Sequence, residues 1–99
     1  MQPKKERYRR IRGALLKFLA YEHPGSVDLK VLHYLLDDLR YTITEEELRS
    51  HLGYLGEKGY LRQEKRKSGH VEIEIITITA QGLDALDGFS PESGINTDF

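Results

Sequence analysis

The sequence predicts an α+β fold in which helices come first and a β-hairpin follows them. Up to residue 58, apolar residues recur at the three-to-four-residue spacing of amphipathic helices. From residue 60 to residue 79 the spacing changes to two, which is typical of strands with one buried face. Gly59 stands at the change, where a glycine often ends a helix.

Length and composition indicate one folded domain. A chain of 99 residues can close one hydrophobic core but not two, and a content of 38% hydrophobic and 31% charged residues is that of a folded protein. No apolar run approaches the roughly 20 residues of a membrane span, and no secretory signal is seen. The absence of cysteine excludes disulfides, thiolate metal sites and a cysteine nucleophile. We expect a cytoplasmic protein that does not associate with membranes.

Two amphipathic helices are predicted in the first half of the chain. The first covers residues 8–22 and ends before Pro24 and Gly25, which stop the helix and form a turn. The second covers residues 29–40, with Asp28 placed to cap it. The apolar faces consist of Tyr8, Ile11, Leu15, Phe18 and Leu19 in the first helix and Val31, Leu32, Leu35, Leu36 and Leu39 in the second.

A third helix begins after Thr44 and ends near Lys58. Thr44 and Glu47 form a capping box, in which the threonine hydroxyl accepts from the amide of Glu47. Three consecutive acids also suit the positive end of the helix dipole. The predicted buried stripe consists of Leu48, Leu52 and Leu55.

Two strands and a short helix follow. The first strand is predicted at residues 60–64, and the second begins with an alternation at residues 71–75. The alternation shifts by one position after Ile75, so we expect a bulge or a twist near Ile75 and Ile76. Residues 66–70 form the predicted hairpin tip. Thr79 is placed to cap a helix at residues 80–86, and residues 89–99 form a predicted flexible tail.

This order of elements is that of a winged helix-turn-helix: a three-helix bundle, a β-hairpin wing and a short C-terminal helix. The helix-turn-helix covers residues 28–58, with residues 40–43 as its connection. The expected organisation is a basic N-terminal arm at residues 1–7, a winged-helix domain at residues 8–88 and the tail at residues 89–99.

The chain also resembles the small winged-helix proteins of Mu-like bacteriophages and prophages, which are often labelled ArsR-like transcriptional regulators. The motifs that carry the resemblance are Ser26-Val27-Asp28 before Leu32, Thr44 before Leu48, Leu52-Gly53-Tyr54-Leu55, Glu57-Lys58-Gly59-Tyr60-Leu61 and Thr79-Ala80-Gln81-Gly82-Leu83. The resemblance implies a cytoplasmic phage or prophage protein, a homodimer, that binds DNA in transcription regulation. The metal sensing that the ArsR label suggests is not expected, because the cysteine motif of those sensors is missing.

The third helix is the candidate recognition helix of this fold. Arg49, Ser50 and Tyr54 fall outside its buried stripe and are candidates for contacts to base edges or phosphates. Three acids of the same helix, Glu46, Glu47 and Glu57, would repel a polyanion. The helix surface is therefore either a DNA reader or a solvated or protein-facing surface.

Two basic clusters are further candidates for DNA contact. The wing carries Lys65, Arg66, Lys67 and His70, which suit phosphate or minor-groove contact. The N-terminal arm and first helix carry Lys4, Lys5, Arg9 and Arg12, which suit a phosphate-binding arm. The alternative for both clusters is a charge run that keeps the surface soluble and, on the wing, protects a strand edge from aggregation.

The sequence gives no support for catalysis, a metal or a cofactor. The four histidines show no metal-binding spacing on a predicted helix, and neither a phosphate-binding glycine loop nor a catalytic triad can be argued. Two hypotheses remain. The first is a regulator that binds double-stranded DNA as a homodimer. The second is a winged-helix protein-interaction module without DNA binding, which the net charge of −1 and the acidic third helix favour.

Overall fold

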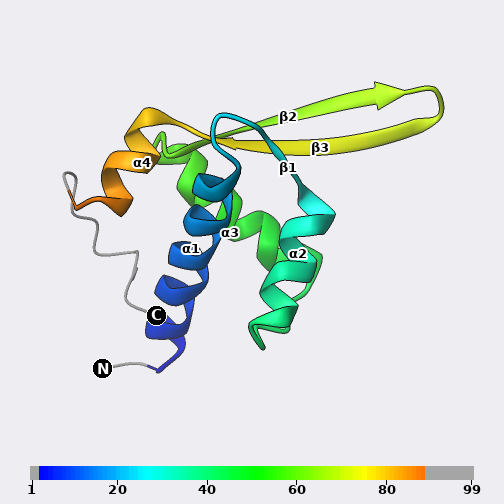
Figure 1. Cartoon of the computed structure of the whole chain (residues 1–99). Coiled ribbons are helices and arrows are strands. Elements are labelled where there is room, and N and C mark those ends of the chain that lie inside the picture. The colour runs from blue at the N-terminus through cyan, green and yellow to red at the C-terminus, as the bar shows by residue number, and fades with distance from the viewer. Residues whose placement is uncertain (1–2, 89–99) are drawn as a thin grey trace.

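The computed structural model describes residues 3–88, which form four helices and a three-stranded antiparallel sheet (Figure 1). The elements in chain order are α1 (Pro3–Glu22), β1 (Val27–Asp28), α2 (Leu29–Asp38), α3 (Glu45–Glu57), β2 (Leu61–Ser68), β3 (Val71–Ile78) and α4 (Ala80–Leu86). The predicted α+β winged helix-turn-helix is confirmed, since three helices precede the β2–β3 hairpin and a short helix follows it. The tail predicted at residues 89–99 lies outside the described residues.

Helix α1 begins at Pro3, earlier than the predicted start at residue 8. Proline suits the first position of a helix, and Glu6 in the first turn pairs with Arg9 at 3.2 Å and with Arg10 at 3.5 Å. These contacts extend the helix beyond its apolar stripe, which starts only at Tyr8. The described part of the predicted basic arm, residues 3–7, is therefore helical and continuous with the rest of α1.

The helix-turn-helix is formed by α2 and α3, and both predicted caps are present. Asp28 Oδ1 accepts from the amide of Lys30 at 2.7 Å, and Thr44 Oγ1 accepts from the amide of Glu47 at 3.1 Å. Helix α2 ends at Asp38, two residues before the predicted end at residue 40. It ends there because Arg40 adopts the left-handed conformation with a φ of 70°, which breaks the helical ladder.

The core lies between the three helices of the bundle and the base of the sheet. Leu48, Leu52 and Leu55 of α3 are fully buried, as predicted. The same cluster contains Ile11, Leu15 and Leu19 of α1, Leu32 and Leu36 of α2, and Ile76 and Ile78 of β3. Burial of each such side chain contributes roughly 1.5–3 kcal/mol, so this cluster fixes α3 against the rest of the domain.

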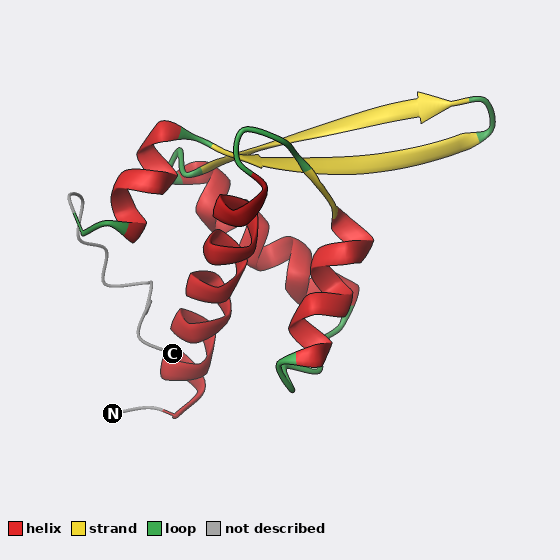
Figure 2. Cartoon of the chain, viewed as in Figure 1, coloured by secondary structure: helices red, strands yellow, loops and turns green. Residues whose placement is uncertain are grey.

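The sheet has the strand order β1-β3-β2, and Figure 2 shows it along one side of the helices, with the free end of the hairpin projecting away from them. Strands β2 and β3 pair without interruption from Leu61 opposite Ile78 to Ser68 opposite Val71. Of the two predicted irregularities near Ile75 and Ile76, the bulge is therefore absent. The first strand of the hairpin is also longer than predicted, and the turn contains only Gly69 and His70.

The shift in the alternation of β3 arises because the helices cover one face of the strand at its base and leave that face open further out, and not because of a bulge. Ile76 and Ile78 point into the core, whereas Val71, Ile73 and Ile75 occupy the opposite face of the same regular strand. The short strand β1, which the sequence did not predict, pairs with β3 at Ile75 and Ile76. The base of β3 thus has a neighbour on both edges, and its outer half pairs with β2.

Helix α4 closes the domain against the start of the hairpin. Thr79 Oγ1 accepts from the amide of Gly82 at 3.1 Å and donates to the carbonyl of Gly59 at 2.5 Å. The predicted cap is therefore confirmed, and it also ties α4 to the end of α3. The Gly59 φ of 77° allows the tight reversal between α3 and β2.

Candidate nucleic-acid interface

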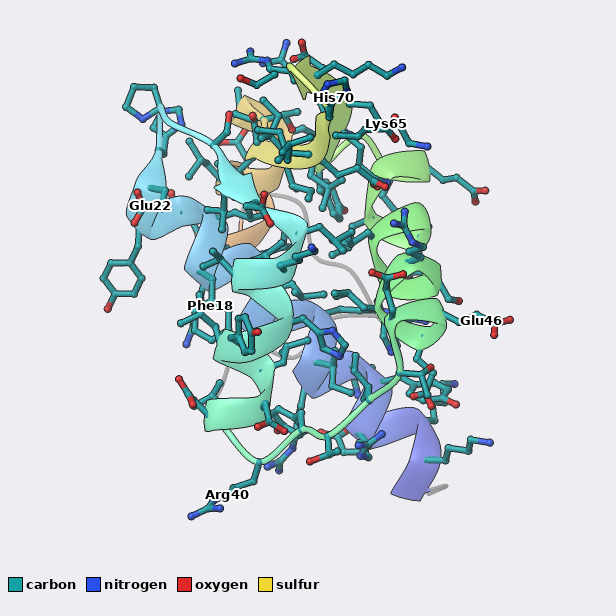
Figure 3. All side chains as sticks on the ribbon, turned by 90° about the vertical axis from the view of Figure 1, so that its right-hand side faces the viewer. Phe18, Glu22, Arg40, Glu46, Lys65 and His70 are labelled. Carbon is teal, nitrogen blue, oxygen red and sulfur yellow. The ribbon has the colours of Figure 1, made fainter. Side chains whose placement is uncertain are left out.

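Helix α3 exposes a ridge opposite its buried leucines. Glu46, Ser50 and Glu57 are exposed on this ridge, and a Cβ atom placed on Gly53 would meet nothing within 4 Å. Figure 3 shows Glu46 pointing away from the helical bundle. The ridge is therefore open to a partner, and two carboxylates stand on it.

Arg49, on the wing side of this ridge, is held by the wing. Its guanidinium contacts both carboxylate oxygens of Glu74, with Nη2 to Oε1 at 2.7 Å and Nη1 to Oε2 at 2.9 Å. Glu45, one turn earlier on α3, lies 3.7 Å from Arg49 Nε. The hydrogen bond with the partner is the main cause that raises the pKa of Arg49 and lowers the pKa of Glu74. Both groups are charged at neutral pH, and the predicted DNA contact of Arg49 is here an ion pair.

Two cations approach the ring of Tyr54, on the other side of the ridge. The guanidinium carbon of Arg12 lies 3.8 Å from the centre of the Tyr54 ring, and Nζ of Lys58 lies 5.6 Å from it. Arg12 comes from α1 and is 42 positions away from Tyr54 in sequence (54 − 12). The structure therefore joins a residue of the predicted N-terminal cluster to the predicted recognition helix, which the spacing along the chain did not indicate.

His51 lies beneath this cation–aromatic cluster and is 4% exposed. Its Nδ1 accepts a hydrogen bond from Nε of Arg12 at 3.2 Å, and its ring meets Tyr8 edge-on with centroids 5.1 Å apart. Burial lowers the pKa of His51 to about 4, and the positive charges of Arg12 and Arg7 add to the effect. His51 is therefore a neutral core residue at physiological pH.

The four predicted basic residues of the wing lie on its two faces and at its tip. Residues that stand opposite each other in the ladder share a face, so Lys65 lies on the face of Glu74 and Lys67 on the face of Glu72. Because Glu74 contacts α3, this is the face that adjoins the recognition helix. Arg66 stands on the opposite face, beside Ile73.

These wing cations have acidic neighbours. Lys65 Nζ lies 3.9 Å from Glu72, and Arg66 Nε lies 3.2 Å from Glu64, in pairs whose side chains are all at least half exposed. Such exposed pairs hold their partners weakly, so the cations can exchange a carboxylate for a phosphate. Figure 3 shows Lys65 and His70 at the wing end of the molecule, with Arg40 at the other end.

The N-terminal cations are spread around α1 and do not form one group. Lys4 Nζ lies 5.9 Å from the ring centre of Tyr8, and Lys5 is exposed. Arg9 is paired with Glu6, and Arg12 stacks on Tyr54. Of the four predicted residues, only Arg12 is brought against the recognition helix by a contact described here.

Further features bound what the site can do. A groove of about 210 Å³ runs between the starts of α2 and α3 and the outer half of β3, with Lys30, Arg49 and Glu72 among its walls.

No group of three or more His, Asp or Glu side chains within residues 3–88 is placed to hold a metal ion. In the same part of the chain, no helix has the length and apolar character needed to cross a membrane.

Glu74 is the site residue that the sequence did not single out. In the sequence it forms part of the polar half of an alternation, and its partner Arg49 lies 25 positions earlier. The sequence did indicate its side of the strand, since the alternation separates Glu72 and Glu74 from Val71, Ile73 and Ile75. Which face of the hairpin adjoins α3 follows only from the packing of Ile76 and Ile78, so that signal could not be used in advance.

The chain is similar in fold to solved structures of transcriptional regulators. No family model matches the chain, and no curated protein matches it significantly in sequence. The crystal structure of a PadR-family transcriptional regulator from Eggerthella lenta DSM 2243 matches with a TM-score of 0.62 and 21% identity, over 80% of this chain and 70% of that one. Bacillus subtilis PadR in complex with operator DNA matches with a TM-score of 0.65 and 14% identity, over 90% of this chain.

The present chain spans 51% of the Bacillus subtilis protein, about half its length. Both neighbours are described as transcriptional regulators. Neither is described as a phage protein, so a phage origin stays a prediction. Since the sequence identities are low, the likeness concerns architecture, and the chain has the winged-helix fold of these regulators.

Proposed function

We propose that this protein is a DNA-binding transcriptional regulator that reads duplex DNA with α3 and contacts the backbone with its wing. The observation that carries the proposal is the exposed ridge of α3 beside a projecting hairpin, whose α3-facing side carries Lys65 and Lys67. The likeness of the fold to a regulator solved in complex with operator DNA supports it.

The ridge of α3 supplies the base contacts in this proposal. An α-helix fits the major groove, and Ser50 and Tyr54 are the polar side chains on or beside the ridge that can donate to base edges or phosphates. Gly53 lets the helix backbone approach the DNA closely. Glu46 and Glu57 favour sequences that present a donor to a carboxylate, such as the N4 amino group of cytosine.

The cations flank the ridge on both sides. Lys65, Lys67 and His70 on the wing would contact phosphates or the minor groove, and Arg66 would contribute from the other face of the ribbon. Arg12 lies on the other side of α3, and Lys4, Lys5 and Arg9 extend the charge along α1. Since the net charge is −1, affinity depends on this local placement rather than on the charge of the whole chain.

The proposed active form is a cytoplasmic homodimer. One winged helix of this size neutralises few phosphates, and a two-fold axis doubles the footprint on a palindromic site. The proposed origin in a phage or prophage rests on the sequence resemblance to the Mu-like proteins.

Duplex binding measured as a function of salt tests the proposal. The logarithm of the affinity should fall linearly with the logarithm of the salt concentration, with a slope equal to about 0.9 times the number of phosphates neutralised. A triple variant with Lys65→Glu, Arg66→Glu and Lys67→Glu should lose binding. Arg40→Glu is the control, because it reverses a charge at the end of the molecule opposite the wing (Figure 3).

The second candidate function is protein docking by the same fold. The exposed carboxylates of Glu46 and Glu57 on the ridge favour it, because they oppose a polyanion and suit a basic partner. Absence of duplex affinity in the wild type at about 50 mM salt, where phosphate contacts are strong, would support docking over DNA binding.

A further inference from the structure

The contact between Arg49 and Glu74 joins the proposed recognition helix to the wing. Arg49 lies on α3 and Glu74 in the outer half of β3, and two parallel contacts of 2.7 and 2.9 Å link the guanidinium to both carboxylate oxygens. A two-pronged contact of this kind fixes orientation as well as distance, which a single lysine ammonium cannot do. The Glu74 side chain is only 12% exposed, so it is largely enclosed by this contact and its surroundings.

The part of the wing that this contact holds has little other support. Strand β1 reaches β3 only at Ile75 and Ile76, so beyond these residues the hairpin continues as a two-stranded ribbon. An isolated two-stranded ribbon is only marginally stable in water and bends easily. An open groove, with Arg49 and Glu74 in its walls, lies between the ribbon and the starts of α2 and α3. The ribbon therefore has room to move toward the helices if the contact is removed.

We propose that Arg49 is a positioning residue, and that its ion pair with Glu74 sets the angle between the wing and the recognition helix. The inference rests on the proposed function for its effect on DNA, and on the structure alone for its effect on the wing. Helix α3 can lie in a groove of the DNA while Lys65 and Lys67 contact phosphates only if this angle is held. A preset angle avoids the loss of affinity that ordering a mobile wing would cause.

A direct role of Arg49 in base reading conflicts with the same geometry. To reach a base, the guanidinium would have to leave Glu74, and a largely enclosed carboxylate would then lose its partner close to the DNA phosphates. The two roles predict opposite effects of neutralising Glu74. Removal of a negative charge favours DNA binding if Arg49 reads bases, and weakens it if the pair positions the wing.

The DNA arm of the test compares Arg49→Gln, Glu74→Gln and Glu72→Gln. We expect the first two variants to lose affinity by a similar factor of about tenfold, and the double variant to lose no more than either, because both remove one shared contact. Glu72→Gln is the matched control, since Glu72 lies on the same face of β3 and pairs with Lys65. It should bind as well as or better than the wild type. Increased affinity in Glu74→Gln would overturn the positioning role.

The second arm measures the wing without DNA. The chain contains no cysteine, so Ser68→Cys near the wing tip and Glu57→Cys on α3 would carry two unique spin labels. We expect a narrow distance distribution in the otherwise wild-type protein and in Glu72→Gln, and a broader or shifted one in Arg49→Gln and Glu74→Gln. The charge-swapped variant Arg49→Glu with Glu74→Arg should narrow it again, at least in part.

The two arms separate the inference from the proposed function. A distance distribution that does not change in Arg49→Gln and Glu74→Gln would overturn the inference, whatever happens with DNA. A distribution that responds, in a protein without duplex affinity, would support the positioning of the wing and contradict the DNA-binding function.

Discussion

Nε of Arg12 donates a hydrogen bond to Nδ1 of His51 over 3.2 Å, which joins α1 to a ring that is 4% exposed on α3. Since Nδ1 must keep its lone pair to accept this bond, the bonded imidazole is neutral and carries its proton on Nε2. Protonation of Nδ1 would break the bond and place a cation beside the guanidinium groups of Arg12 and Arg7. Burial and these two charges account for the pKa of about 4.

The first prediction is a loss of stability in mild acid caused by His51. The unfolded chain has the ordinary histidine pKa of 6.5, above the folded value of about 4, so between these values the unfolded state binds more protons. The contribution of His51 to the free energy of unfolding is therefore fully present above pH 6.5 and falls as the pH drops toward 4. We expect a loss on the order of 2 kcal/mol over this range, measured by denaturant titration at each pH.

The control for this prediction is His51→Gln. Glutamine can accept from Arg12 but does not titrate, so the difference between wild type and variant isolates the histidine from the acidic residues. Parallel stability curves for the two proteins from pH 7 to pH 4 would contradict the buried neutral state of His51.

The second prediction concerns Gly82 in α4. A Cβ atom at this position would overlap the carbonyl oxygen of Tyr60 and lie 2.7 Å from Cγ1 of Ile78. Because the first obstacle is backbone, a change of rotamer cannot relieve the overlap. We expect Gly82→Ala to lower the free energy of unfolding by about 3 kcal/mol or more, measured by chemical denaturation. A stability equal to that of the wild type would show that α4 does not pack this closely on Tyr60.

The third prediction concerns Gly53, which provides the contrasting case. A Cβ atom there meets nothing within 4 Å, and alanine favours a helix over glycine by about 1 kcal/mol. We expect Gly53→Ala to raise the free energy of unfolding by up to about that amount. If α3 approaches DNA closely at this point, the same variant should bind duplex DNA more weakly, so stability and affinity should change in opposite directions. Improved affinity would place Gly53 outside the interface.

The fourth prediction compares two adjacent cations of the wing. Lys67 lies on the face of β2 that adjoins α3, and Arg66 lies on the other face. Each is exposed, and each can be neutralised to Gln with the same change in net charge. We expect Lys67→Gln to reduce the salt slope of duplex binding by about one, the effect of losing one phosphate contact. Arg66→Gln should reduce it less, and the reverse order would mean that the wing presents its other face to DNA.

The fifth prediction tests the link between α4 and the end of α3. Thr79 Oγ1 accepts from Gly82 and donates to Gly59, so Thr79→Ala removes a helix cap and one further hydrogen bond. We expect a loss of about 1–2 kcal/mol in the free energy of unfolding. Thr79→Ser, which keeps the hydroxyl, should retain most of the stability. Equal losses in both variants would point to the threonine methyl group instead.

The helices could be predicted because their signals are local. Thr44 and Glu47 stand three positions apart, and the three buried leucines of α3 recur at helical spacing. One short segment of sequence therefore contains all the signals for the helix and its cap. The start of α1 was missed because its first turns are stabilised by Glu6 with Arg9 and Arg10, an electrostatic signal that an apolar stripe does not contain.

The sheet was predicted less well because its faces depend on distant residues. An alternation of Ile and Glu gives the period of a strand but not which face is buried. In β3, Ile76 and Ile78 are buried because the helices lie on their side, and the apolar outer residues Ile73 and Ile75 stand opposite Arg66 and Glu64. The two-residue strand β1 is too short for any period, so only the pairing with β3 reveals it.

The candidate site shows the same division. The sequence singled out Tyr54 and Arg12 separately, and each lies in the helix that was predicted for it, Arg12 in α1 and Tyr54 in α3. Their stacking at 3.8 Å, and the capture of Arg49 by Glu74, depend on how α1 and β3 pack against α3. Contacts of this kind join residues 25 and 42 positions apart, over which sequence spacing carries no information.

Asp28 holds two structural roles at one position. Its side chain caps α2 through the amide of Lys30, and its backbone lies beside Ile75 in the sheet. The first helix of the helix-turn-helix and the middle strand of the sheet therefore share a single hinge point, with no intervening loop to absorb a displacement. A displacement of β3 at Ile75 would therefore pass to the start of α2 directly, whereas the ribbon beyond Ile75 can bend without moving this helix.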